Sequence, residues 1–163
     1  MNKRFLCGVT ILAIIVGFLI WHYSDAQVIK RKSNTLIDTL NITGSETRSF
    51  RLLKTGSFTN LLARSVICRV NLVNYRSDYS YDELEAQHHL FVHNVDTSSV
   101  TASNMAVSII GDGSAEVTAE LSLSLTGKND AGFSEAGKLA LLWKKDTAGK
   151  WHITKLVITS RNR

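Results

Sequence analysis

The side chains of residues 115–126 alternate between apolar and polar without an exception. Every even position carries Glu, Thr or Ser, whereas every odd position is alanine, valine or leucine. A β-strand points successive side chains to opposite faces, so this pattern predicts a strand with one face on a core and the other on water or a polar cavity. The rest of the fold must therefore cover the odd face of this strand.

Three neighbouring segments extend this strand into a predicted sheet. Residues 105–110 are apolar except for Ser108 and lead through the Gly-Asp-Gly-Ser turn at 111–114 into the alternating strand. Residues 138–144 are apolar on both faces, which favours a central strand. After a turn that contains Gly149, residues 151–160 return as another strand. The sequence thus predicts four consecutive antiparallel strands in the C-terminal third.

The last of these strands contains an irregularity. Trp151 and Ile153 share one parity, but Leu156 and Ile158 have the other. A β-bulge near residues 154–155 would return all four side chains to the core side. Because bulges bend a sheet, we expect the sheet to be strongly curved.

The N-terminal region indicates a membrane segment. Residues 5–23 are uncharged and mostly apolar, about as long as a helix needs to cross a hydrocarbon core of about 30 Å. Two interpretations stay open, namely a retained anchor with Trp21 and Tyr23 at the interface, or a signal peptide cleaved after Ala26. The anchor is favoured because the run exceeds the usual signal core of ~7–15 residues.

The short tail before this run further predicts a bacterial-type inner membrane, with the domain on the extracytoplasmic side or secreted after cleavage. Residues 1–26 are thus the predicted anchor or signal peptide, and residues 27–163 form one predicted domain. We expect the membrane to be contacted through residues 5–23.

Charge and cysteine content narrow the partner classes. The formal net charge is +5, but five basic residues flank the apolar run, and the remaining chain is nearly neutral. A nucleic-acid-binding domain would carry a basic stripe, so no nucleic-acid partner is predicted. The three basic residues at 30–32 could contact anionic headgroups. Cys7 and Cys68 cannot form a disulfide within the domain, and Cys68 is predicted to be a buried, inert thiol.

Helical patterns occupy the first part of the predicted domain. Residues 27–41 follow helical spacing, and residues 50–63 indicate one or two short helices interrupted by Gly56. Residues 66–73 predict a strand, and the polar residues 74–79 predict a turn.

A capping box marks the start of a further helix. Ser80 and Glu83 have the spacing at which each side chain bonds the other residue's amide. Leu84, His88 and Phe91 form the apolar stripe of this helix, and residues 95–104 predict a polar connection into the sheet.

This order of elements carries a family resemblance. Three segments resemble the C-terminal half of the nuclear transport factor 2-like, or SnoaL-like, superfamily: Val-Ser-Ile-Ile-Gly-Asp-Gly-Ser-Ala-Glu-Val at 107–117, Gly-Lys-Leu-Ala-Leu-Leu-Trp at 137–143, and Gly-Lys-Trp-His-Ile-Thr-Lys-Leu-Val-Ile at 149–158. The resemblance implies an α+β, cystatin-like cone, in which N-terminal helices pack on a strongly curved antiparallel sheet with a cavity at the open end. Here the cone would follow one transmembrane helix. The family includes isomerases, dehydratases, non-catalytic ligand binders and secretion scaffolds, so the fold does not define the function.

Six side chains are candidates for a site. His88 interrupts an apolar stripe, so it is either a hydrogen-bonded core histidine or an acid/base that faces the cavity. Tyr79 and Tyr81 could donate to a ligand oxyanion, although tyrosines beside a helix usually cover its end. Glu85, His89 and His93 lie four residues apart on one helix face, a spacing suited to a metal ion. An exposed polar face is the preferred interpretation of that triplet, and we assign no catalytic residue, metal or cofactor.

Three functions remain open at this level. The preferred one is a membrane-tethered, extracytoplasmic, non-catalytic domain that binds a protein partner, a second copy of itself or a small apolar ligand. The second is an isomerase- or dehydratase-type enzyme with His88 as base and a tyrosine as electrophile. The third is a scaffold subunit of an envelope or secretion assembly. The first is preferred because no acid/base constellation is visible in the sequence.

Overall fold

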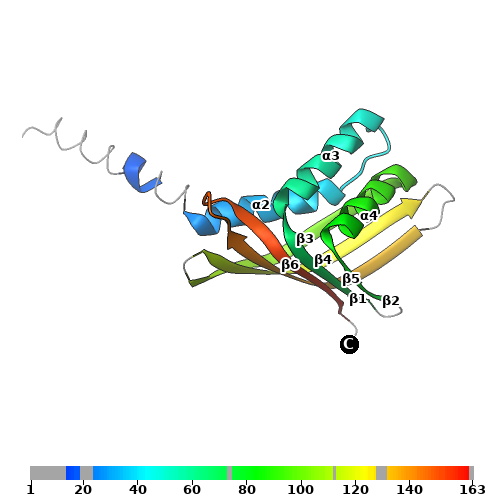
Figure 1. Cartoon of the computed structure of the whole chain (residues 1–163). Helices are drawn as coiled ribbons and strands as arrows, with labels where there is room; N and C mark the ends of the chain where they lie inside the picture. The colour runs from blue at the N-terminus through cyan, green and yellow to red at the C-terminus, as the bar shows by residue number, and fades with distance from the viewer. Residues whose placement is uncertain (1–13, 19–23, 73–74, 112, 128–131, 162–163) are drawn as a thin grey trace, which may run out of the picture.

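The computed structural model of the chain describes residues 14–18, 24–72, 75–111, 113–127 and 132–161 (Figure 1). Most of the predicted membrane segment, residues 5–23, lies outside these ranges. Within the ranges, no helix is both long enough and apolar enough to cross a membrane. The first long helix, α2 (Asp25–Leu40), follows Ser24, whose backbone is extended with ψ at 145°. α2 confirms the helix predicted for residues 27–41 and begins two residues earlier.

The domain is an α+β fold in which three helices cover one face of a curved, six-stranded sheet (Figure 1). The strand order is β2-β1-β6-β5-β4-β3. All neighbouring strands are antiparallel except β1 and β6, which run parallel. The strands are β1 (Leu62–Leu72), β2 (Tyr75–Tyr79), β3 (Val95–Gly111), β4 (Ser114–Gly127), β5 (Gly132–Lys145) and β6 (Trp151–Ser160).

The alternating strand is β4, and its odd face packs on the core as predicted. Ala115 and Val117 are fully buried, whereas Glu116 and Thr118, which alternate with them, are exposed. β5 lies between β4 and β6, which confirms its central position. Its side chains Leu141 and Trp143 are among the most deeply buried of the described residues.

The predicted bulge in β6 is confirmed. Ile153 pairs with Trp143 and Lys155 pairs with Leu142, which leaves Thr154 as the extra residue. The Thr154 hydroxyl donates to the carbonyl of Leu142 at 3.3 Å. The shift keeps the apolar side chains on the core side, because Ile153 and Leu156 are both buried despite their different parity.

Three strand boundaries differ from the sequence-based prediction. Residues 74–79, expected to form a turn, contain strand β2, and residues 95–104, expected to be a connection, form the first half of β3. β5 begins at Gly132 rather than at residue 138. All three misjudged stretches are polar or Gly-containing and lie in edge strands or strand ends, where hydrogen bonds to a neighbouring strand supply the order that an apolar pattern does not reveal.

Of the two other helices, α3 (Arg48–Leu61) packs against both α2 and α4 (Tyr81–Asn94). α3 is one helix that passes through Gly56 without a break. The capping box of α4 is present, and the Ser80 amide donates to a Glu83 carboxylate oxygen at 2.7 Å. The apolar stripe of α4 buries Leu84 and His88, as expected.

Arg51 of α3 closes the C-terminal end of α4. Its Nη1 donates to the carbonyls of Val92 and Val95 at 3.2 and 2.7 Å, and its Nη2 donates to those of Thr43 and Asp96 at 3.4 and 3.2 Å. The last carbonyls of a helix have no partner within the helix, and a cation there also interacts favourably with the helix dipole. One side chain thus fastens two helices and the start of β3.

Candidate ligand-binding cavity

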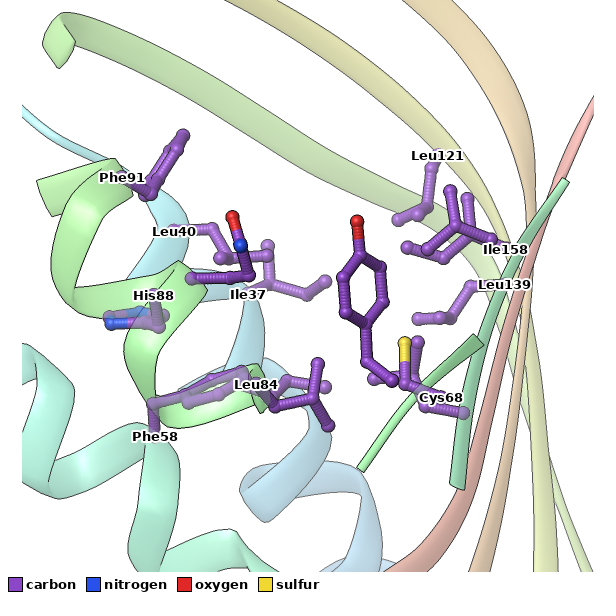
Figure 2. A pocket seen from close by; sticks show the side chains of 15 residues that line it. Ile37, Leu40, Phe58, Cys68, Leu84, His88, Phe91, Leu121, Leu139 and Ile158 are labelled. Atoms are coloured by element: carbon purple, nitrogen blue, oxygen red, sulfur yellow. The ribbon is translucent and has the colours of Figure 1, made fainter. Parts of the chain in front are cut away.

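A cavity of about 220 Å³ lies between the helices and the concave face of the sheet (Figure 2). A second space of about 160 Å³ shares five of its wall residues and continues it along β4 and β5. The residues common to both spaces are Leu40, Val70, Phe91, Leu121 and Ile158.

The apolar wall follows from patterns visible in the sequence. The odd face of β4 supplies Leu121 and Leu123, and the helical stripe of α2 supplies Leu36, Ile37 and Leu40. In Figure 2 the labelled sheet residues face Ile37 and Leu40 across the cavity. The odd-numbered side chains in the first half of β4 are therefore part of the core, and those in its second half line the cavity.

A few polar groups interrupt this wall. The Tyr79 and Gln87 side chains line the larger space, and the Glu135 carboxylate lines the smaller one. Glu135 Oε1 accepts a hydrogen bond from the Ser160 hydroxyl at 2.8 Å. Ser160 is buried and Glu135 is partly exposed, so this pair forms a polar spot at one end of an apolar space.

His88 is buried between α4 and α3. Its Nδ1 lies 3.1 Å from the Thr55 hydroxyl, and its ring stacks on Phe58 with 4.3 Å between ring centroids. Although His88 contributes to the wall, Figure 2 shows its ring on the side of α4 that faces away from Leu121 and Leu139 of the sheet. This is the environment of a core histidine that bonds a neighbouring helix.

Burial also sets the charge state of His88. Loss of hydration lowers the pKa of its imidazole to about 4, and this effect outweighs the nearby Thr39 carbonyl, which favours the protonated form. The ring is therefore neutral at pH 7. A base with so low a pKa abstracts protons weakly.

The two tyrosine candidates lie at different places. Tyr79 lines the cavity from β2, and its hydroxyl is hydrogen-bonded to that of Tyr75. Tyr81 is buried at the start of α4, with the Arg64 guanidinium 4.2 Å from its ring centroid, and it borders a separate surface hollow. The structure thus brings Tyr79, but not Tyr81, to the cavity.

The three metal candidates lie on the exposed side of α4. His89 and His93 border a shallow hollow with Arg48 and Arg51, but Glu85 does not. In the part of the chain that the structure describes, no three His, Cys, Asp or Glu side chains are placed to hold a metal ion.

Cys68 lies in the cavity wall and is only 2% exposed. Burial, with a smaller contribution from the charge of Asp78, raises the pKa of the Cys68 thiol to about 12. The thiol is therefore protonated at neutral pH, which agrees with the prediction of an inert cysteine.

Glu135, Ser160 and Gln87 were not identified from the sequence. Glu135 has the parity of Leu139 and Leu141 on β5, so it lies on their side of the sheet. Extending that strand back to residue 132 would have placed an acidic residue on the inner face. The surrounding glycines instead favoured a loop there.

No protein-family model matches the sequence, and no curated protein matches it significantly. Solved structures do match. A nuclear transport factor 2-like superfamily protein from Salmonella enterica serovar Typhimurium has 10% sequence identity and a TM-score of 0.67, with 85% of this chain and 92% of that one covered. A protein with a cystatin-like fold from Caulobacter vibrioides has 16% identity and a TM-score of 0.64, covering 85% and 89%. The association domain of C. elegans CaMKII has 18% identity and a TM-score of 0.56, covering 82% and 94%.

These similarities establish the architecture. The chain has the cystatin-like fold of the nuclear transport factor 2-like proteins, as the sequence segments at 107–117, 137–143 and 149–158 led us to expect. At these identities the likeness extends to the fold alone, and function has to be argued from the site.

Proposed function

We propose that this chain is a membrane-tethered, extracytoplasmic, non-catalytic domain that binds a small, mainly apolar ligand in the cavity of its cone. The observation that carries the proposal is the pair of neighbouring cavities, of about 220 and 160 Å³, which share five wall residues and have largely apolar walls. Together these volumes reach the lower part of the range of ~300–1,000 Å³ usual for small-molecule sites. Transfer of an apolar ligand from water into such a space is favourable by the hydrophobic effect.

The polar groups of the wall suit orientation better than catalysis. Glu135 and Ser160 lie at one end and can receive a donor group of the ligand, while Tyr79 and Gln87 can bond a second polar group. An enzyme of the isomerase or dehydratase type needs a base aimed at the reacting atom. The His88 ring is instead bonded to Thr55 on the helical side, which supports a binding role.

The tether rests on the apolar run and on the five described residues within it. Ile14 and Phe18 are 65% and 57% exposed to solvent. Large apolar side chains that are exposed on an apolar helix are stabilised when the helix lies in the hydrocarbon core of a bilayer.

Nile red titration of the full-length chain in lipid nanodiscs tests cavity binding. Leu121→Trp places a bulky ring inside the cavity, whereas Ser122→Trp places the same ring on the opposite, exposed face of β4. We expect saturable binding by the parent and by Ser122→Trp, and about tenfold weaker binding, or ~1.4 kcal/mol, for Leu121→Trp. Dye dissolved in the lipid is common to all three chains and cancels in the comparison.

Two results would contradict the proposal. One is equal dye affinity in the two tryptophan variants when both retain the far-ultraviolet dichroism of the parent. The other is a purified chain that turns over a substrate in a manner abolished by His88→Leu.

A second candidate function is self-association through the outer face of the sheet. Ile67 is 55% exposed there and pairs with the exposed Lys155 of β6. Val157 of β6 and Leu142 of β5, which lie next to Lys155, are partly exposed. One of the similar structures is described as an association domain. Sedimentation of the chain should show a dimer that Ile67→Lys dissociates, and a monomer at all concentrations would exclude this role.

A further inference from the structure

The start of α2 lies at the same end of the domain as two hairpin turns. The Asp25 carboxylate accepts hydrogen bonds from Trp151 Nε1 at 3.0 Å and from Lys145 Nζ at 2.9 Å. The Lys145 amide donates to the Gly113 carbonyl at 2.9 Å. The β3–β4 and β5–β6 turns are thereby held beside the point where the chain enters the domain, at the left of Figure 1.

The β3–β4 hairpin presents apolar side chains at this end. Ile109 and Ile110 are 49% and 59% exposed. Successive residues of a strand point to opposite faces, so isoleucine is present on both sides of the hairpin tip. A hairpin tip in water does not need two adjacent large apolar side chains, whereas one at a lipid surface is stabilised by them.

The same end is basic on its outer surface. Lys144 and Lys150 are exposed beside the two turns. Of the carboxylates described at this end, Asp25 is bonded to Lys145, and Asp146 accepts from the Ala148 and Lys150 amides at 2.9 and 2.8 Å. Glu116 is exposed on β4, diagonally across from Lys144. Lys30 and Arg31 add two exposed basic side chains from the first half of α2, whereas Lys32 is partly buried and donates to the Trp151 carbonyl at 2.9 Å.

We propose that this end of the domain lies on an anionic phospholipid surface, with Ile109 and Ile110 inserted among the headgroups and Lys144 and Lys150 beside the phosphates. The inference rests on the proposed tether, because the apolar run enters the domain at Asp25 and would hold this end close to the bilayer. Basic side chains near an anionic surface and apolar side chains in its interfacial region both favour such contact.

The contact would orient the cavity. Glu135 and Lys145 lie at opposite ends of β5, ten residues or about 30 Å apart along the strand. Glu135 and Ser160, at the polar end of the cavity, are therefore directed away from the bilayer. A ligand would enter from the aqueous side rather than from the lipid.

Site-specific fluorescence on the full-length chain tests the contact. In a Cys7→Ser background, Ser108→Cys near the hairpin tip and Ser134→Cys at the far end of the sheet each receive an NBD fluorophore. Cys68 does not interfere, because its thiol is buried and protonated, and the parent with Cys7→Ser measures any residual labelling. The chains are reconstituted into phosphatidylcholine vesicles with or without phosphatidylglycerol and with doxyl-labelled lipid as quencher.

We expect blue-shifted emission and quenching by the doxyl lipid at position 108 but not at position 134, most strongly with phosphatidylglycerol. The double substitution Lys144→Gln/Lys150→Gln removes two positive charges. Each lost charge should reduce the ratio of membrane-bound to free hairpin tips about fivefold. The matched variant Lys138→Gln/Arg161→Gln removes the same charge at the middle of β5 and just after β6, away from the two turns, and should leave the signal unchanged.

The outcomes separate this inference from the tether on which it rests. A chain that does not float with vesicles refutes the tether and with it the membrane contact. A chain that floats, but whose NBD emission at position 108 matches that at position 134, refutes the contact alone. Equal loss of signal in the two double charge variants refutes the assignment of the basic surface.

Discussion

Replacing His88 by leucine should make the stability of the domain less dependent on pH. In the folded state burial lowers the pKa of the His88 imidazole to about 4, whereas in the unfolded chain it titrates near its ordinary value of 6.5. Between these values the unfolded state binds the extra proton and the folded state does not. Stability therefore falls as the pH decreases from 6.5 towards 4, and the penalty is absent above 6.5.

The magnitude follows from the shift. One pH unit within the window corresponds to about 1.4 kcal/mol, so His88 should cost the parent about 2 kcal/mol at pH 5 and on the order of 3 kcal/mol at pH 4. At pH 7.5 His88→Leu loses the bond to Thr55 and the stacking on Phe58, but keeps the apolar bulk. Because Thr55 can bond a carbonyl of its own helix instead, we expect the two chains to differ by no more than about 1 kcal/mol there.

Urea unfolding followed by tryptophan fluorescence at several pH values between 7.5 and 4.5 provides the measurement. The carboxylates of the domain titrate equally in both chains, so the difference between the two curves isolates His88. His88→Leu should be the more stable chain at pH 5. Parallel curves, with a constant difference at every pH, would refute the neutral, buried imidazole described above.

Three further outcomes test other parts of the structure. Arg51→Lys keeps the charge but loses the branched donor at the end of α4, and should lower the free energy of unfolding by about 1–2 kcal/mol in urea denaturation. A Cβ at Gly137 would lie 2.5 Å from the Thr159 carbonyl oxygen, so Gly137→Ala should lower the free energy of unfolding by about 1–3 kcal/mol. Gly132→Ala is the control, because its Cβ would meet open space, and it should leave the thermal midpoint nearly unchanged. In a Cys7→Ser chain, Cys68 should react with Ellman's reagent at pH 8 only after urea unfolds the protein, and rapid reaction of the folded chain would contradict its pKa of about 12.

The sequence by itself determined the sheet that organises the protein. The alternation in residues 115–126 indicated which face of β4 is buried, and the change of parity between Ile153 and Leu156 located the bulge. The capping box at Ser80 marked the start of α4. These features are local, because period-two alternation and cap chemistry depend on residues only a few positions apart.

Only the tertiary structure decided how the polar residues are used. The polar stretches in β2 and β3 become strands through hydrogen bonds to their neighbours, which no local pattern encodes. His88 faces Thr55 rather than the cavity because α3 packs beside α4, and Glu135 reaches the cavity because β5 extends further than its apolar residues do. In each case the partner is distant in the sequence, so the contact exists only once the helices and the sheet have packed together.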